Sequence, residues 1–149
     1  YSNEWAFEVL AELGFKYSSS TYPVNHDLYG TPDWPRFAYN RPENILEIPI
    51  PTLRIMGKQI PIGGGGYFRL YPYKITEKLV SKYLRQEKQP YSFYFHPWEI
   101  DAGQPRLKNA PLKSRFRHYV NLHRTEAKLI RLLDDFNWST MRDVYGIIK

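Results

Sequence analysis

The segment Phe95–Asp101 (FHPWEID) gathers the side chains best suited to chemistry. Its imidazole, His96, titrates near neutral pH and could act as a general acid or base. Glu99 and Asp101 place carboxylates close by. The aromatic stretch 91–95 before it predicts a buried strand, and polar groups directly after a strand are where α/β folds bind ligands. The alternative is that His96 only hydrogen-bonds a carbonyl of its own loop.

A run of four glycines, residues 63–66, is followed closely by Arg69. Glycine allows positive φ and a close approach of the backbone to another group. No Gly-Lys-Ser/Thr follows, so the run is not a phosphate-binding loop. Arg69 is a candidate contact for an anion or a carboxylate, although a flexible turn has the same pattern.

Two further groups have both a functional and a structural interpretation. His26-Asp27 could be an imidazole oriented by a carboxylate or part of a metal site, or Asp27 could only close a local turn. The stretch 114–119 (SRFRHY) alternates basic and aromatic residues, which suits sugars and nucleobases. Alternatively, it is a loop that packs Phe116 and Tyr119 inward.

Composition limits the class of protein. The chain has 149 residues, 42% of them hydrophobic, which predicts one domain over residues 1–149. The absence of cysteine excludes disulfides, thiolate metal sites and cysteine nucleophiles. The four scattered histidines do not predict a complete zinc site. Apolar runs are too short to span a bilayer and no leader is visible, so we expect a cytoplasmic protein, with the periplasm as the alternative.

The formal net charge of +6 is unevenly distributed. Six basic residues and no acidic one lie between positions 104 and 125: Arg106, Lys108, Lys113, Arg115, Arg117 and Arg124. Such a segment attracts anionic polymers, or is simply a solvated loop. Nucleic-acid binding would rest on charge alone, so we expect no nucleic-acid partner.

The pattern of apolar residues predicts alternating helices and strands. Helices are expected over 3–13 (capped by Asn3 and ended by Gly14), over 75–88, over 122–135, and from Ser139 or Thr140 onward. Strands are expected over 15–17, 45–50, 53–56 and 91–95, with a hairpin turn at Gly57-Lys58. The predicted apolar faces are Trp5, Ala6, Val9, Leu10 and Leu13; Ile75, Leu79, Tyr83 and Leu84; and Leu122, Leu129, Ile130, Leu132 and Leu133. The fold class is therefore α/β, with helices packed on a mostly parallel sheet.

An ordered series of motifs carries a resemblance to a known family. It consists of residues 5–20 (WAFEVLAELGFKYSSS), 22–30 (YPVNHDLYG), 64–70 (GGGYFRL), 96–101 (HPWEID) and 114–119 (SRFRHY). The series resembles the carboxyl-terminal half of exosortase-associated polysaccharide deacetylases, a branch of the NodB-homology, carbohydrate esterase family 4 group. The resemblance extends over essentially the whole chain.

The resemblance implies a distorted (β/α) barrel of NodB-homology type that removes acetyl groups from an N-acetylated exopolysaccharide. It implies a divalent metal, zinc in most members, held by one Asp and two His, and a second Asp as base. Phe93-Tyr94-Phe95-His96 is similar to the Leu-x-His motif whose histidine is the general acid, which gives that role to His96. The turn after Tyr17 resembles the region that lines the acetyl pocket, and Trp98 would form part of its wall. Arg69, His26, Asp27 and Glu99 are the other predicted substrate contacts.

The chain departs from the family at its amino-terminal side. The Asp-Asp and His-x-x-x-His motifs lie upstream in the family, and nothing here matches them. Tyr1-Ser2 would be at most the tail of the upstream Arg-x-Pro motif. We therefore expect the metal ligands outside this chain, in the same protein or on a second chain, and an inactive fragment. The alternative is a non-catalytic glycan-binding module of the same fold that uses Trp34, Trp98 and the aromatic loops.

Overall fold

The computed structural model describes residues 3–25 and 30–147. It is a mixed α/β structure with small sheets. The chain divides into two compact units, residues 1–61 with 139–149, and residues 62–138. In the described ranges, no helix has the length and apolar character needed to cross a membrane.

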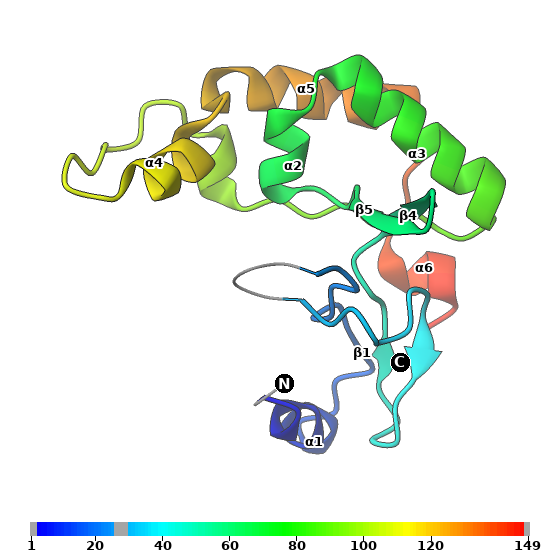
Figure 1. Cartoon of the computed structure of the whole chain (residues 1–149). Helices are drawn as coiled ribbons and strands as arrows, with labels where there is room; N and C mark the ends of the chain where they lie inside the picture. Colours follow the sequence, from blue (N-terminus) through cyan, green and yellow to red (C-terminus); the bar gives the residue numbers. More distant parts are fainter. Residues whose placement is uncertain (1–2, 26–29, 148–149) are drawn as a thin grey trace. The chain divides into compact units, whose positions relative to one another are not determined.

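The first unit is built on short strands (Figure 1). Strand β3 pairs in parallel with β1 and antiparallel with β2, giving the order β1-β3-β2. Strands β4 and β5 form an antiparallel hairpin. Its loop, Met56-Gly57, has positive φ at both residues, as the tight turn between twisted strands requires. The elements are α1 (Trp5–Glu12), β1 (Tyr17–Ser18), β2 (Tyr39–Asn40), β3 (Leu46–Glu47), β4 (Thr52–Ile55), β5 (Lys58–Pro61) and α6 (Met141–Tyr145).

The second unit is mainly helical (Figure 1). Its elements are α2 (Gly65–Leu70), α3 (Tyr73–Glu87), the 3-10 helix η1 (Pro97–Ile100), α4 (Leu112–Tyr119) and α5 (Leu122–Asp135). Helices α2, α3 and α5 enclose its core, which is made of Phe68, Tyr73, Val80 and Leu132. Phe93 packs edge-on against Phe68, with ring centroids 4.8 Å apart.

Several predicted elements are confirmed. Helix α5 spans the predicted residues 122–135. Helix α6 begins after Thr140, whose side chain accepts a hydrogen bond from Asp143 N. Gly14 follows the end of α1 with φ of +80°. The capping prediction for Asn3 is wrong, because Glu4 is the N-cap and no side chain caps the helix.

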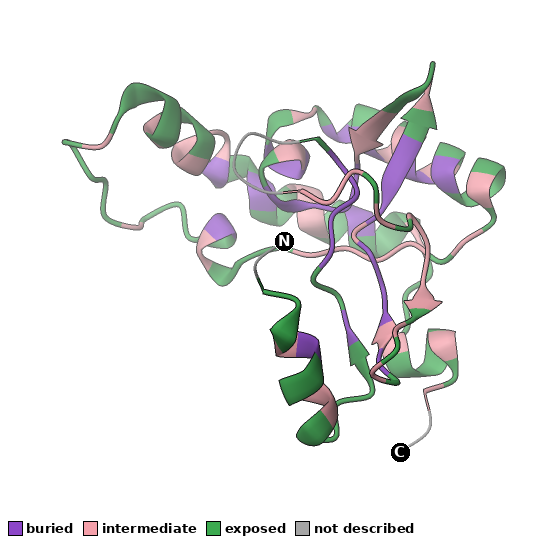
Figure 2. Cartoon of the chain, turned by 60° about the horizontal axis from the view of Figure 1, so that its bottom comes forward, coloured by how far each residue is buried: buried purple, intermediate pink, exposed green. Residues whose placement is uncertain are grey.

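All three predicted apolar faces are partly wrong. Helix α3 buries Tyr73, Thr76, Val80 and Tyr83, whereas the predicted Ile75 and Leu84 are exposed. Helix α5 leaves the predicted Ile130 and Leu133 exposed. Helix α1 buries Phe7 in place of the predicted stripe and is mostly exposed (Figure 2). Which of two adjacent stripes is buried depends on the groups that pack against the helix. In α3 the buried tyrosine hydroxyls donate to polar partners: Tyr73 to the Asp135 carboxylate, and Tyr83 to Pro90 O.

The prediction of a strand over residues 91–95 is also wrong. Only Tyr94 pairs, in a single parallel bridge with Gly64. The side chains of Tyr91 and Phe93 pack on the helical core, and Phe95 is 39% exposed. The segment connects the end of α3 to η1 and stays irregular because no neighbouring strand among the described residues continues the ladder beyond this bridge. Helices α2 and α4 were not predicted, since their glycines and charges hide the helical pattern.

Candidate functional site

A buried ion pair lies at the centre of the predicted site residues of the second unit. Arg69, on α2, and Glu99, in η1, are 3% and 2% exposed. Arg69 Nε donates to Glu99 Oε1 over 3.0 Å. A buried charge is stable only when it is neutralised and hydrogen-bonded, and this pair meets both conditions.

The remaining donors of Arg69 hold the junction between α4 and α5. Its Nη1 donates to His118 O at 2.6 Å, and its Nη2 donates to Arg117 O at 2.9 Å. In return, Asn121 Nδ2 donates to Arg69 O at 3.0 Å. The predicted anion contact therefore has internal partners, and we assign Arg69 a positioning role.

Glu99 connects this ion pair to the predicted acid. Its second oxygen, Oε2, accepts the backbone N–H of His96 at 3.0 Å. His96 is the N-cap of η1, and Pro97 begins that helix. The backbone of His96 is thus held by a carboxylate whose own position is set by Arg69. The imidazole of His96 is exposed.

Aromatic rings form a row beside the ion pair. The His96 and Trp98 rings are nearly parallel, at 8°, with centroids 5.8 Å apart. The Trp98 and His118 rings stack at 4.2 Å. Tyr119 meets His118 edge-on at 4.6 Å. The guanidinium of Arg69 lies 4.9 Å from the Trp98 ring centroid, so Trp98 also contacts the ion pair.

Gln104 determines the tautomer of His118. Its Nε2 donates to Trp98 O at 2.7 Å and to Asp101 O at 2.9 Å. Its Oε1 must then accept the 2.7 Å hydrogen bond from His118 Nε2. Neutral His118 consequently carries its proton on Nε2 and presents Nδ1 as the acceptor nitrogen.

The glycine run brings the backbone against Tyr94, as its composition predicts. Tyr94 N donates to Gly63 O at 2.9 Å, and Gly65 N donates to Tyr94 O at 3.2 Å. Gly64 has φ of +127°, and a Cβ there would lie 2.0 Å from Tyr94 O. Only glycine fits this approach, which anchors the segment leading to His96.

Lys128 is a charged group that the sequence analysis did not single out. Its ammonium donates to the carbonyls of Phe68 and, at 2.6 Å, Tyr71, which end α2. A cation is favoured there by the helix dipole. Burial, together with the charges of Arg124 and Arg69, lowers the pKa of Lys128 to about 8. The sequence does not reveal this role, because Lys128 reaches these carbonyls only when α5 packs against α2.

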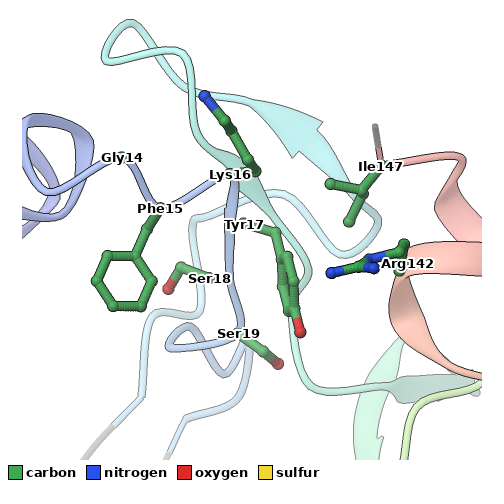
Figure 3. A pocket seen from close by; sticks show the side chains of 8 residues that line it. All are labelled: Gly14, Phe15, Lys16, Tyr17, Ser18, Ser19, Arg142 and Ile147. Carbon is green, nitrogen blue, oxygen red and sulfur yellow. The ribbon is translucent and has the colours of Figure 1, made fainter. Parts of the chain in front are cut away.

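The other predicted site residues lie elsewhere. Tyr17 is 40% exposed and lines a cavity of about 570 Å³ in the first unit (Figure 3). The lining also includes Phe15, Lys16 and Arg142. In Figure 3 the Arg142 guanidinium points toward the Tyr17 ring. His26 and Asp27 lie outside the described residues.

The divalent metal that the resemblance implies would be held by one Asp and two His. In residues 3–25 and 30–147, no three His, Asp or Glu side chains come together to hold an ion. These residues do not fit a metal centre by themselves.

Sequence reasoning missed His118, Gln104 and Asn121 as parts of the site. The stretch 114–119 was singled out, but Phe116 is 60% exposed while His118 packs inward on Trp98. The useful signal was the helical spacing of Leu112, Phe116 and Tyr119, which places His118 on the opposite face.

The comparisons with known proteins place the chain in a family. The DUF3473 family, described as a domain of unknown function, matches residues 19–146. No curated protein and no solved structure gives a significant match.

Proposed function

The chain belongs to the DUF3473 family, and we propose that it is the carboxyl-terminal part of a polysaccharide N-deacetylase. The substrate is an acetylated exopolysaccharide. In this proposal the barrel is completed, and the divalent metal is held, by residues outside this chain. The observation that carries the proposal is the setting of His96, an exposed imidazole whose backbone is held by a buried ion pair.

His96 acts as the proton donor to the leaving group. When water has added to the acetyl carbonyl, the C–N bond breaks and the sugar nitrogen takes a proton from the imidazolium of His96. The acetyl group leaves as acetate, with one oxygen from the added water, and the sugar keeps a free amine. A general acid must hold a fixed position relative to the nitrogen it protonates. The hydrogen bond from His96 N to Glu99 supports this role because it fixes the backbone that carries the imidazole.

Trp98 supports the acid and borders the sugar. Its ring is nearly parallel to the His96 ring and stacks on the His118 ring. Flat aromatic surfaces suit the apolar faces of sugar rings. Tyr17 is proposed as part of the wall of the acetyl pocket, whereas Arg69 and Glu99 act as positioning residues.

The test uses the protein that contains both this chain and the expected metal-binding part. Acetate release from an N-acetylated polysaccharide is measured for wild type, His96→Ala and His123→Ala. His123 is exposed on α5 of the same unit, so it controls for loss of a surface histidine. We expect His96→Ala to lose about 10²–10⁴-fold in turnover, with bound metal and KM nearly unchanged, and His123→Ala to keep its activity.

Two outcomes would overturn the proposal. Full turnover in His96→Ala would remove the acid role. Oligosaccharide binding by the zinc-loaded wild type without any acetate release would favour the glycan-binding module instead, for which the row of aromatic rings is the supporting observation. Trp98→Ala separates these roles further, because it should weaken substrate use more than metal binding.

A further inference from the structure

Helix α4 has the reverse of the usual orientation of an amphipathic helix. It buries none of its residues. Its apolar side chains Leu112 and Phe116 are 80% and 60% exposed. The helix contacts its own unit through the polar side, where His118 stacks on Trp98 at 4.2 Å. His118 follows Phe116 by two residues, which is about 200° around a helix. The apolar stripe therefore points away from the unit.

The loop before α4 adds a third exposed apolar side chain. Leu107 is 69% exposed. Its backbone N–H donates to Tyr119 Oη at 3.0 Å, and that hydroxyl donates to Pro105 O at 3.2 Å. The loop is thereby attached to the last turn of α4. Leu107, Leu112 and Phe116 form what we call the α4 apolar patch.

The charge along the segment that carries the α4 apolar patch has one sign. The six basic residues between positions 104 and 125 surround it in sequence, with no carboxylate among them. Arg106 lies over the Tyr119 ring at 5.2 Å, next to the attachment point of the loop. Arg115 precedes Phe116, and Lys108 follows Leu107 directly. A partner for this surface must therefore offer both negative charge and an apolar interior.

We propose that α4 and its preceding loop dock this protein on the surface of a membrane containing anionic lipids. A bilayer interface supplies anionic headgroups above acyl chains, which matches basic side chains flanking Leu and Phe. Insertion of the three apolar side chains requires no change in the unit, because they already point outward. The docking is peripheral and is independent of the deacetylase proposal.

A vesicle flotation experiment tests this docking. The full chain is mixed with phosphatidylcholine vesicles with and without phosphatidylglycerol. We expect it to float only with the anionic vesicles, and to be released as salt rises because surface charges are screened. The variant Leu112→Ser/Phe116→Ser should have a partition coefficient onto the anionic vesicles that is lower by about tenfold or more. Lys108→Gln/Arg115→Gln should also lose about tenfold.

The matched control is Ile130→Ser/Leu133→Ser on α5. These two side chains are 54% and 51% exposed in the same unit, so their loss should leave flotation unchanged. Equal loss in both serine variants would overturn the proposal, as would no binding of wild type to anionic vesicles. Binding that survives Leu112→Ser/Phe116→Ser but not the charge variant would indicate a contact with any polyanion, nucleic acid included, and would also overturn it. So would a dimer of wild type that this serine variant abolishes, without vesicle binding.

Discussion

Two buried glutamates, one in each unit, are stabilised in different ways. Glu99 is neutralised by Arg69 across 3.0 Å. Glu47, which is 0% exposed in β3, is held by uncharged groups: its Oε1 accepts from Ser20 N, Thr21 N and Thr21 Oγ1 at 2.8–2.9 Å. Within the described residues, its Oε2 has no hydrogen-bond partner.

The different partners of Glu99 and Glu47 indicate what each carboxylate does. Glu99 joins elements far apart in sequence, because its partner Arg69 also bonds the α4–α5 junction. Glu47 reaches a similar distance along the chain, 26 and 27 residues, but it binds a single turn, the one that follows β1, with which β3 pairs. Charge should therefore be essential at Glu99, whereas an acceptor atom should be nearly sufficient at Glu47.

The largest effect is expected from Arg69→Met. This change leaves Glu99 buried without its cation and also removes the donors to His118 O and Arg117 O. We expect the free energy of unfolding to fall by about 3–5 kcal/mol, measured by urea denaturation. Arg131→Met is the control, because Arg131 is exposed and its guanidinium lies over the Tyr73 ring. A loss below about 1 kcal/mol would show that the pair is not stabilising.

Glu99→Gln tests the charge alone. The amide keeps the shape of the side chain but leaves the Arg69 guanidinium buried and without a counter-ion. We expect a loss of about 3 kcal/mol. The double variant Arg69→Met/Glu99→Leu should recover part of it, since removing both members of a buried pair leaves no uncompensated charge. A double variant as unstable as the sum of the single changes would argue against coupling.

The corresponding changes at Glu47 should be smaller and ordered differently. Glu47→Leu leaves Ser20 N, Thr21 N and Thr21 Oγ1 without an acceptor, which should cost about 2–3 kcal/mol. Glu47→Gln keeps a carbonyl oxygen for these donors and should cost only about 1 kcal/mol. Thermal unfolding of both variants measures the difference. Equal losses would mean that charge matters at Glu47 as it does at Glu99.

Lys128 gives the smallest effect and a pH dependence. It is a second cation in the unit of Arg69, but its ammonium donates to backbone carbonyls and not to a carboxylate. Its pKa is lowered from 10.5 to about 8, first by burial and then by Arg124 and Arg69. Between these values the unfolded state holds more protons, so stability must rise with pH. The cost of burying the charge is fully present below pH 8 and disappears above the unfolded pKa.

The measurement compares wild type with Lys128→Met across that pH range. The unfolding free energy of wild type should rise relative to the variant from about pH 8 upward. Other titrating groups, such as Tyr73, contribute equally to both proteins. Parallel curves would show that hydrogen bonds to the carbonyls of Phe68, Arg69 and Tyr71 offset the effect of burial.

Helix positions were the most predictable part of the fold. The apolar spacing of residues 122–135 was enough to place α5, and Thr140 was enough to begin α6. The stripe on α3 was not predictable, because Ile75 and Leu79 are as apolar as the residues that are buried. For the site, local sequence connected His96, Trp98 and Glu99, which lie within one turn of each other.

The amino-acid sequence by itself determined local features of this protein: the span of α5, a hairpin turn containing Gly57, and a close approach of the backbone at the glycine run, where Gly64 meets Tyr94. The turn is centred on Met56-Gly57, one residue before the predicted Gly57-Lys58. These features depend on neighbours a few residues away. Only the tertiary structure decided that Arg69 serves Glu99 and the α4–α5 junction, 30 and about 50 residues away, and that His118 joins Trp98. The physical reason is that a buried charge takes whichever partners the packing of α2, η1 and α5 brings to it, and this choice leaves no periodic pattern along the chain.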